Sequence, residues 1–219
     1  MDTKIGFNLP HSALIRIWHW LTFGLLAFTL FTVLAGNTML KTKNTAGLVK
    51  NSLKEHGIVV SDDQAKGVSR EFKDLMWTWH KIIGYGLGIL LFSRFIMEFM
   101  QSRNERIAVR IQNAKLAIKN SGKDVNLDTS DLKHFIKVNR AYLLFFLLLL
   151  FMAVSGLGMA YEDDVPWLDH IKNLNHTLHG YGQYLIYAYL ILHIGGVVIA
   201  DMTKHRGIVS SMINGKPTN

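Results

Sequence analysis

The stretch AYLLFFLLLLFMAVSGLGMAY (residues 141 to 161) decides the fold class, because it is almost wholly apolar and carries no charged residue. An α-helix needs about twenty apolar residues to cross the hydrocarbon core of a bilayer. An amphipathic helix of a soluble bundle would carry a polar face, and this stretch is too long and too uniformly apolar for one. It therefore predicts a transmembrane helix.

Three further apolar runs have a similar length, and the chain as a whole has a positive mean hydropathy with 49% hydrophobic residues. The runs are IWHWLTFGLLAFTLFTVLAG (17 to 36), WTWHKIIGYGLGILLFSRFIMEF (77 to 99) and HGYGQYLIYAYLILHIGGVVIA (179 to 200). Three charged residues of the second run lie near its ends, where long side chains can reach the lipid headgroups. They are Lys81, Arg94 and Glu98.

We therefore predict an all-α fold, a four-helix transmembrane bundle in a single integral-membrane domain that spans residues 1 to 219. The expected helices cover about residues 12–36, 72–101, 138–161 and 176–201, with a long first external loop and a long cytoplasmic loop between them. The first run is too long for the core of a signal peptide and no clear small-residue cleavage site follows it. We expect it to remain as an anchor.

The composition excludes several kinds of site and partner. There is no cysteine, which excludes a disulfide framework, a cysteine-bound iron-sulfur cluster and the covalent attachment of c-type haem. The net charge of +8 could favour nucleic acid, but the basic residues flank the apolar runs and no nucleic-acid-binding motif accompanies them. Membrane topology explains these residues more simply, and we expect no nucleic-acid partner.

The distribution of lysine and arginine predicts the orientation, because cytoplasmic loops carry an excess of positive charge. The segments before the first run, between the second and third runs and after the fourth run hold fourteen of these residues, against eight in the other two segments. The short connection EDDVPWLDHIKN (162 to 173) has four acids and one lysine, and we expect it outside. Both termini are then cytoplasmic.

Two local patterns predict packing rather than chemistry. The segment NERIAVRIQNAKLAIKN (104 to 120) predicts a basic amphipathic helix on the inner leaflet, with a solvated connector as the alternative. Glycines four apart in GYGLG (84 to 88), namely Gly84 and Gly88, and the motif SGLG (155 to 158) predict close helix packing. The apolar face of the amphipathic segment consists of Ile107, Ile111, Ala114 and Ile118.

Four histidines lie in or at the edge of the apolar runs, and they are the candidate ligands of a metal cofactor: His19, His80, His179 and His193. Ionisable groups inside a membrane are costly and are functional by default. On a helix, His179 and His193 face the same side to within roughly 40° and lie about 21 Å apart along the axis. One face of the fourth helix thus offers a nitrogen ligand near each leaflet.

The direction of each helix predicts which histidines are partners. The second and fourth helices enter from outside, with His80 and His179 near their starts, whereas the first helix enters from the cytoplasm with His19 near its start. Depth therefore pairs His80 with His179, and His19 with His193. Two such bis-imidazole sites, stacked across the bilayer, suit a redox metal in a planar macrocycle.

Each candidate also has a simpler alternative. A single histidine beside tryptophan, as in WHW (18 to 20), is more often an aromatic-belt residue than a ligand. His176 is the rival of His179 as outer ligand, although an offset of roughly 100° from His193 turns it to another face. Three cations could pair with a haem propionate or simply contact lipid phosphate: Arg16, Lys81 and Arg140.

The order of the motifs along the chain resembles the bacterial di-haem cytochrome b family, the membrane-anchor subunits of nickel-iron hydrogenases, formate dehydrogenases and thiosulfate reductases. The resemblance covers all four helices and implies two non-covalent b-type haems, one held by His19 with His193 and one by His80 with His179. The two long loops depart from the family pattern. The motifs are RIWHW (16 to 20), WHKIIGYGLG (79 to 88), VNRAYLLFFLLLLFMAVSGLGM (138 to 159) and the two histidines of the fourth helix.

The resemblance implies respiratory electron transfer in a bacterial inner membrane, between an extramembrane redox subunit and quinone as the mobile substrate. We expect an electron-transferring anchor of an oxidoreductase, able to form homo-oligomers, rather than a complete enzyme. The alternatives are a stand-alone superoxide:quinone oxidoreductase or a transmembrane ferric reductase, with Lys81 and His176 at the approach to the outer haem. A haem-free transporter is a third possibility.

Overall fold

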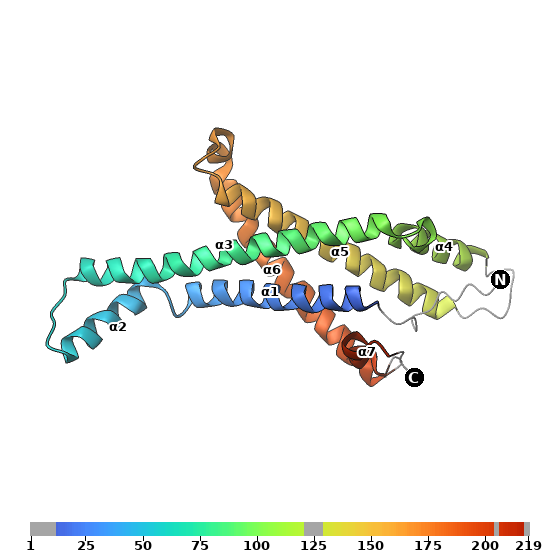
Figure 1. The fold of residues 1–219 in the computed structure, drawn as a ribbon, viewed down its shortest axis with the longest axis horizontal. Coiled ribbons are helices and arrows are strands. Elements are labelled where there is room, and N and C mark those ends of the chain that lie inside the picture. Colours follow the sequence, from blue (N-terminus) through green and yellow to red (C-terminus); the bar gives the residue numbers. More distant parts are fainter. Residues whose placement is uncertain (1–11, 121–128, 204–205, 217–219) are drawn as a thin grey trace. The chain divides into compact units, whose positions relative to one another are not determined.

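The computed structural model describes residues 12–120, 129–203 and 206–216, and the described residues form helices and connections without a strand (Figure 1). The predicted all-α fold is therefore confirmed. A 3-10 turn, η1, covers Arg103–Glu105. The helices are α1 (Ala13–Asn37), α2 (Thr42–Glu55), α3 (Asp62–Met100), α4 (Ile107–Asn120), α5 (Thr129–Ala160), α6 (Pro166–Met202) and α7 (Ile208–Asn214).

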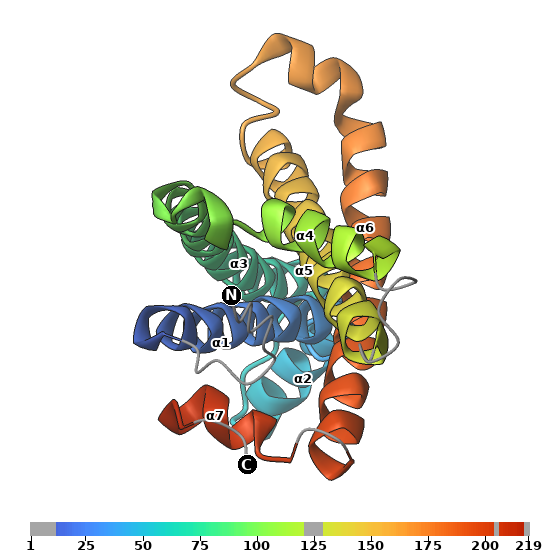
Figure 2. The ribbon, with the colours of Figure 1, turned by 90° about the vertical axis from the view of Figure 1, so that its right-hand side faces the viewer.

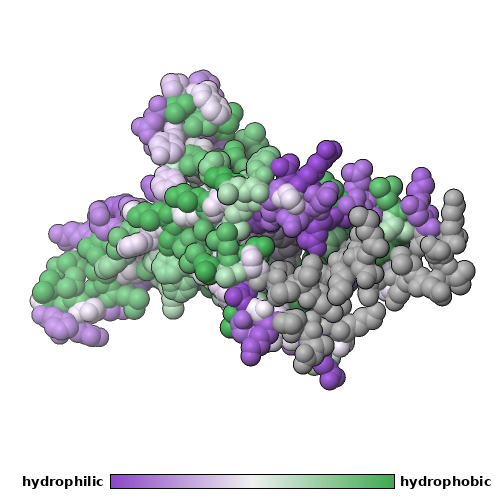
Figure 3. Space-filling view, turned by 45° about the vertical axis from the view of Figure 1, so that its right-hand side comes forward, coloured by the Kyte–Doolittle hydropathy of each residue, from purple (hydrophilic) through white to green (hydrophobic). Residues whose placement is uncertain are grey.

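Four of these helices, α1, α3, α5 and α6, are long and apolar enough to cross a membrane, as the sequence predicts. Their apolar side chains face outward along much of their length, and Phe92, Leu147 and Leu192 are 66%, 63% and 75% exposed. Figure 3 shows hydrophobic residues over much of the visible surface. In a bilayer this surface contacts lipid rather than water, because lipid tails are as apolar as the side chains.

Three of the spanning helices begin earlier than their apolar runs. α3 begins at Asp62 rather than near residue 72, because Ser61 and Gln64 form a reciprocal capping box: each side chain accepts a hydrogen bond from the other's backbone N–H, at 3.2 and 2.8 Å. α6 begins at Pro166, in the first turn, where proline is tolerated. α5 begins at Thr129. The long loops of the sequence prediction are thus occupied in large part by helix.

The chain divides into two compact units. One contains α1 up to His19, α3 from Ile89 onward, and α4 to α7, whereas the other contains the rest of α1, α2 and α3 up to Gly88. Within the first unit, α5 and α6 pack on each other in the parts next to the hairpin that joins them, from the contact of Ser155 with His179 to that of Phe145 with Tyr189 (Figure 2). This helix pair is the scaffold on which both histidines of α6 are placed.

Glycines allow α5 and α6 to approach closely. A Cβ at Gly158 would lie 2.7 Å from Nδ2 of Asn175, and a Cβ at Gly182 would lie 2.5 Å from Sδ of Met152. The packing role predicted for SGLG is therefore confirmed. The same role predicted for Gly84 and Gly88 is wrong, since a Cβ at either would meet nothing within 4 Å; in that motif it is Gly86 that packs, against Leu25.

The segment after α3 forms the predicted amphipathic helix, α4, but its apolar face does not lie on the leaflet. Ile111 and Ala114 are buried, and the start of α5 covers them. Arg110 extends over the ring of Phe135 at 5.0 Å from its centre. The apolar face of α4 therefore packs on a neighbouring helix. The sequence pattern predicts an apolar face, but it does not distinguish a lipid leaflet from another helix as the surface that this face contacts. The covering residues are Leu132, Phe135 and Ile136.

We predict that Gly182→Ala destabilises the α5–α6 pair by about 1–3 kcal/mol, because the new methyl group overpacks against Met152 and Phe151. The control is Gly180→Ala on the same helix, where a Cβ meets nothing within 4 Å and alanine adds helix propensity of about 1 kcal/mol. Thermal unfolding in detergent, followed by circular dichroism, compares the two. Equal melting temperatures would show that the close approach of α5 and α6 is unimportant for stability.

Candidate functional site

The structure brings His19 of α1 and His193 of α6 together. Their ring centres lie 6.5 Å apart with an angle of 53° between the ring planes. Both residues belong to the same compact unit. Two histidines from helices far apart in the sequence thus present their imidazoles to each other.

This separation fits a metal ion held between the two rings. A metal–nitrogen bond of about 2 Å on each side would place the ring centres about 6 Å apart. Among the described residues no group of three His, Asp or Glu side chains gathers into a metal site. Paired neutral imidazoles with no other protein ligand are typical axial ligands of a haem iron, whose four remaining positions the macrocycle fills.

Neighbouring aromatic residues hold this pair in place. The indole N–H of Trp18 donates a hydrogen bond of 2.8 Å to the carbonyl of Leu90 on α3, and Trp18 is buried. Tyr189, one turn before His193, stacks on its ring with 6.0 Å between centres and 9° between planes. Phe145 of α5 stacks in turn on Tyr189. Trp18 therefore packs inside the unit, against α3.

His80 lies on α3 in the other unit, against α1. Its Nδ1 is 2.9 Å from the hydroxyl oxygen of Thr32, and that hydroxyl donates to the carbonyl of Thr29 at 2.6 Å. Thr32 is fully buried, and Trp77 meets the His80 ring edge to face at 5.3 Å.

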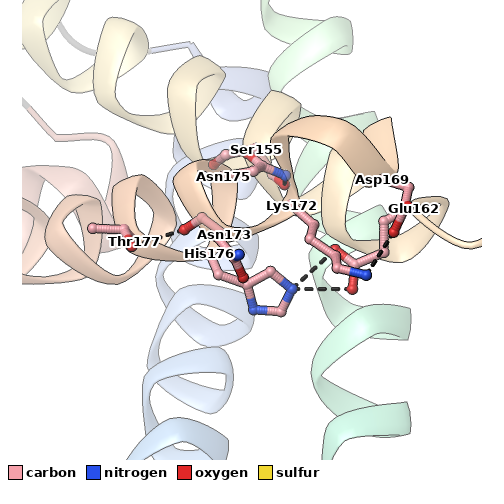
Figure 4. A network of polar contacts seen from close by, with 8 residues as sticks. All are labelled: Ser155, Glu162, Asp169, Lys172, Asn173, Asn175, His176 and Thr177. Atoms are coloured by element: carbon pink, nitrogen blue, oxygen red, sulfur yellow. Dashed lines mark hydrogen bonds and ion pairs between the residues drawn. The ribbon is translucent and has the colours of Figure 1, made fainter. Parts of the chain in front are cut away.

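His179 lies on α6 against α5. Its Nδ1 is 2.8 Å from the hydroxyl oxygen of Ser155, which donates to the carbonyl of Phe151 at 2.7 Å. Asn175, one turn earlier on α6, donates to the carbonyl of Ser155 at 3.0 Å (Figure 4). The ring of His179 is therefore held against α5, and Gly156 leaves room for it, since a Cβ there would lie 3.3 Å from Cε1.

The structure gives His176, the rival of His179, a different neighbour. Its Nε2 lies 2.9 and 3.1 Å from the two carboxylate oxygens of Glu162, at the exposed hairpin between α5 and α6 (Figure 4). Lys172 forms a neighbouring ion pair with Asp169 at 2.6 Å. His176 thus belongs to a surface network, while His179 packs into the helix pair.

Two of the three cations that could meet a haem propionate, Arg16 and Lys81, form no ion pair with an acid among the described residues. The guanidinium of Arg16 lies against Gly215, where it occupies the space that a Cβ would need. Lys81 is exposed and forms no ion pair among the described residues. Their pairing with propionates stays a prediction.

Sequence reasoning misplaced one further cation. Arg94 does not reach toward headgroups: it is 5% exposed, with Nε donating to the hydroxyl of Tyr142 and Nη1 paired with Glu98 at 3.2 Å. Glu98 also accepts the backbone N–H of Ile107 at the start of α4, at 2.6 Å. The signal in the sequence was the four-residue spacing of Arg94 and Glu98, which suits an intrahelical pair.

A family model described as prokaryotic cytochrome b561 matches residues 10–215 of the chain. The match covers all four candidate spans and all the histidines discussed above. Searches against curated proteins and against solved structures gave no significant match.

We predict that Arg94→Ala lowers the free energy of unfolding by about 3 kcal/mol, because it removes the cationic partner of Glu98, whose side chain is only 25% exposed and retains the hydrogen bond from Ile107 N–H. Arg70→Ala, an exposed arginine on the same helix, should change it by less than about 0.5 kcal/mol. Thermal unfolding of both variants in detergent gives the comparison. Similar losses of unfolding free energy in the two variants would show that the pair of Arg94 and Glu98 does not stabilise the fold.

Proposed function

The chain belongs to the prokaryotic cytochrome b561 family, and from that premise we propose that it is a di-haem cytochrome that passes electrons between an extramembrane redox partner and quinone. Family membership and the four apolar helices make it a bacterial multi-pass membrane protein that binds b-type haem and works in electron transfer. The number of haems, their ligands and the two redox partners are the proposal. So is its role as the anchor subunit of a respiratory oxidoreductase.

The observation that supports the proposal best is the approach of His19 to His193, at 6.5 Å between ring centres. These two residues would hold the inner haem. A bound haem supplies one-electron redox chemistry, while the chain supplies axial nitrogens, apolar insulation and a fixed position. Tyr189 stacks on the His193 ring, and Phe145 stacks on Tyr189.

His80 and His179 would hold the outer haem. Their pairing rests on the sequence, which places both near the external ends of their helices. Each ring is held through Nδ1 by a buried hydroxyl, so that Nε2 is the nitrogen directed to a metal. Along α6 the two proposed ligands of that helix lie about 21 Å apart, which places one haem near each leaflet.

The charges of the α5–α6 hairpin favour an anchor subunit over a superoxide-consuming enzyme. The segment 162 to 173 carries four acids and one lysine, and His176, just beyond it on α6, contacts one of these acids, Glu162. An acidic external surface repels an anionic substrate such as superoxide and attracts a basic redox partner. With the external hairpin outside, both termini lie in the cytoplasm.

The proposed function is tested by purified chain in detergent, first with a quinol analogue and then with superoxide. The quinol should transfer electrons to the chain and produce the absorbance spectrum of reduced b-type haem. Superoxide should not reduce quinone in the presence of the chain unless a second subunit is added. Rapid quinone reduction by superoxide in the isolated chain would instead make it a self-sufficient enzyme. A colourless protein would overturn the cytochrome proposal altogether.

Ligand variants test the assignment of each histidine, read out by haem content and reduced-minus-oxidised spectra. We predict that His19→Ala and His193→Ala each remove the inner haem and leave the outer one, whereas His179→Ala removes the outer haem, because each haem needs both axial nitrogens. The control is His170→Ala, an exposed residue that bonds only the backbone of Pro166 among the contacts described.

His176→Ala separates the two candidates for the outer ligand. We expect it to keep both haems and to lose only the contact between His176 and Glu162. If it loses the outer haem while His179→Ala retains it, His176 is the ligand.

A further inference from the structure

We infer that Thr32 and Ser155 are positioning residues, whose hydroxyls hold the rings of His80 and His179 so that Nε2 of each ring is presented to the outer haem. The inference rests on the proposed function, because it takes these histidines as ligands. It assigns a role to two polar residues that lie inside apolar runs and are buried.

The direction of the hydrogen bonds follows from the number of protons. A hydroxyl has one proton to donate. Thr32 donates its proton to the carbonyl of Thr29 at 2.6 Å, and Ser155 donates its proton to the carbonyl of Phe151 at 2.7 Å. Each hydroxyl oxygen can therefore only accept from the histidine beside it. Nδ1 of His80 and of His179 then carries the proton, and Nε2 carries the lone pair that binds a metal.

The same arrangement occurs twice, on different helices. On α1 and α3, Thr32 meets His80 at 2.9 Å, and on α5 and α6, Ser155 meets His179 at 2.8 Å. In each case the hydroxyl donates a hydrogen bond to a carbonyl three or four residues earlier on its own helix. Both hydroxyl residues are buried, with 0% and 5% exposure. Water cannot easily replace either hydroxyl at these buried positions, so the loss of the hydroxyl weakens the hydrogen bonding of the histidine N–H beside it.

A hydrogen bond at Nδ1 does more than orient the ring. It raises the basicity of the ligating nitrogen, which favours the more positive, oxidised iron. Removal of the hydroxyl should therefore raise the midpoint potential of the haem and weaken its binding. The effect should be larger for Ser155 than for Thr32, because the carbonyl of Thr29 is a second acceptor beside the His80 ring.

The test is potentiometric titration of the purified, haem-loaded chain with Thr32→Val and Ser155→Ala. Both variants should raise the potential of the same one of the two haems and leave the other unchanged. The dissociation constant of that haem should rise about tenfold to a hundredfold. Thr32→Ser and Ser155→Thr keep a hydroxyl and should show the wild-type potential. These two variants keep the inference testable if Thr32→Val or Ser155→Ala folds poorly.

Matched controls are Thr38→Val and Ser93→Ala, because each of these hydroxyls bonds a carbonyl of its own helix region and no histidine in the contacts described. They should leave both potentials unchanged. Two haems in the wild-type chain with unchanged potentials in Thr32→Val and Ser155→Ala would overturn this inference alone. A wild-type chain without haem would overturn the proposed function first.

Discussion

The desolvation of polar groups in hydrocarbon is the constraint on which the rest of this structure depends. A backbone N–H or carbonyl that faces lipid must be satisfied inside its own segment, which is why the described spans are helices. The same rule applies to side chains. Within the spans, Thr32 and Ser155 bond both a histidine and a carbonyl, and Arg94 meets Tyr142 and Glu98. Each of these polar side chains is bound by another part of the same unit.

Under this constraint α6 combines two tasks. Gly182 lets it pack closely on α5, and the same helix carries His179 and His193 on one face. One histidine turns toward the hydroxyl of Ser155, and the other meets His19 and stacks on Tyr189. A rigid helix pair thus sets the positions of two imidazoles, which is what a scaffold for electron transfer must do if its redox centres are to keep a fixed spacing.

Much of the fold and part of the site could be predicted from the sequence. Hydropathy over about twenty residues identifies the four spans, and helical periodicity places His179 and His193 on one face. The ends of α3 and α6 could not be read this way, because a capping box and an N-terminal proline extend the helices into polar sequence. The partners of serine and threonine within a span also could not be predicted. Contacts between helices depend on the rotation of each helix about its axis and on its depth in the membrane, and the hydropathy pattern of the sequence does not encode either. Arg94 was misplaced although its four-residue spacing from Glu98 suits an intrahelical pair.

The central claim is that four histidines on three helices hold two b-type haems in this one chain. The most direct measurement is the haem-to-protein ratio of the purified full-length chain, determined by extracting the haem and measuring its absorbance, together with the low-temperature electron paramagnetic resonance spectrum of the oxidised protein. The account predicts two haems per chain and two low-spin signals typical of paired imidazole ligands. A ratio of one, or a high-spin signal from one centre, would contradict it.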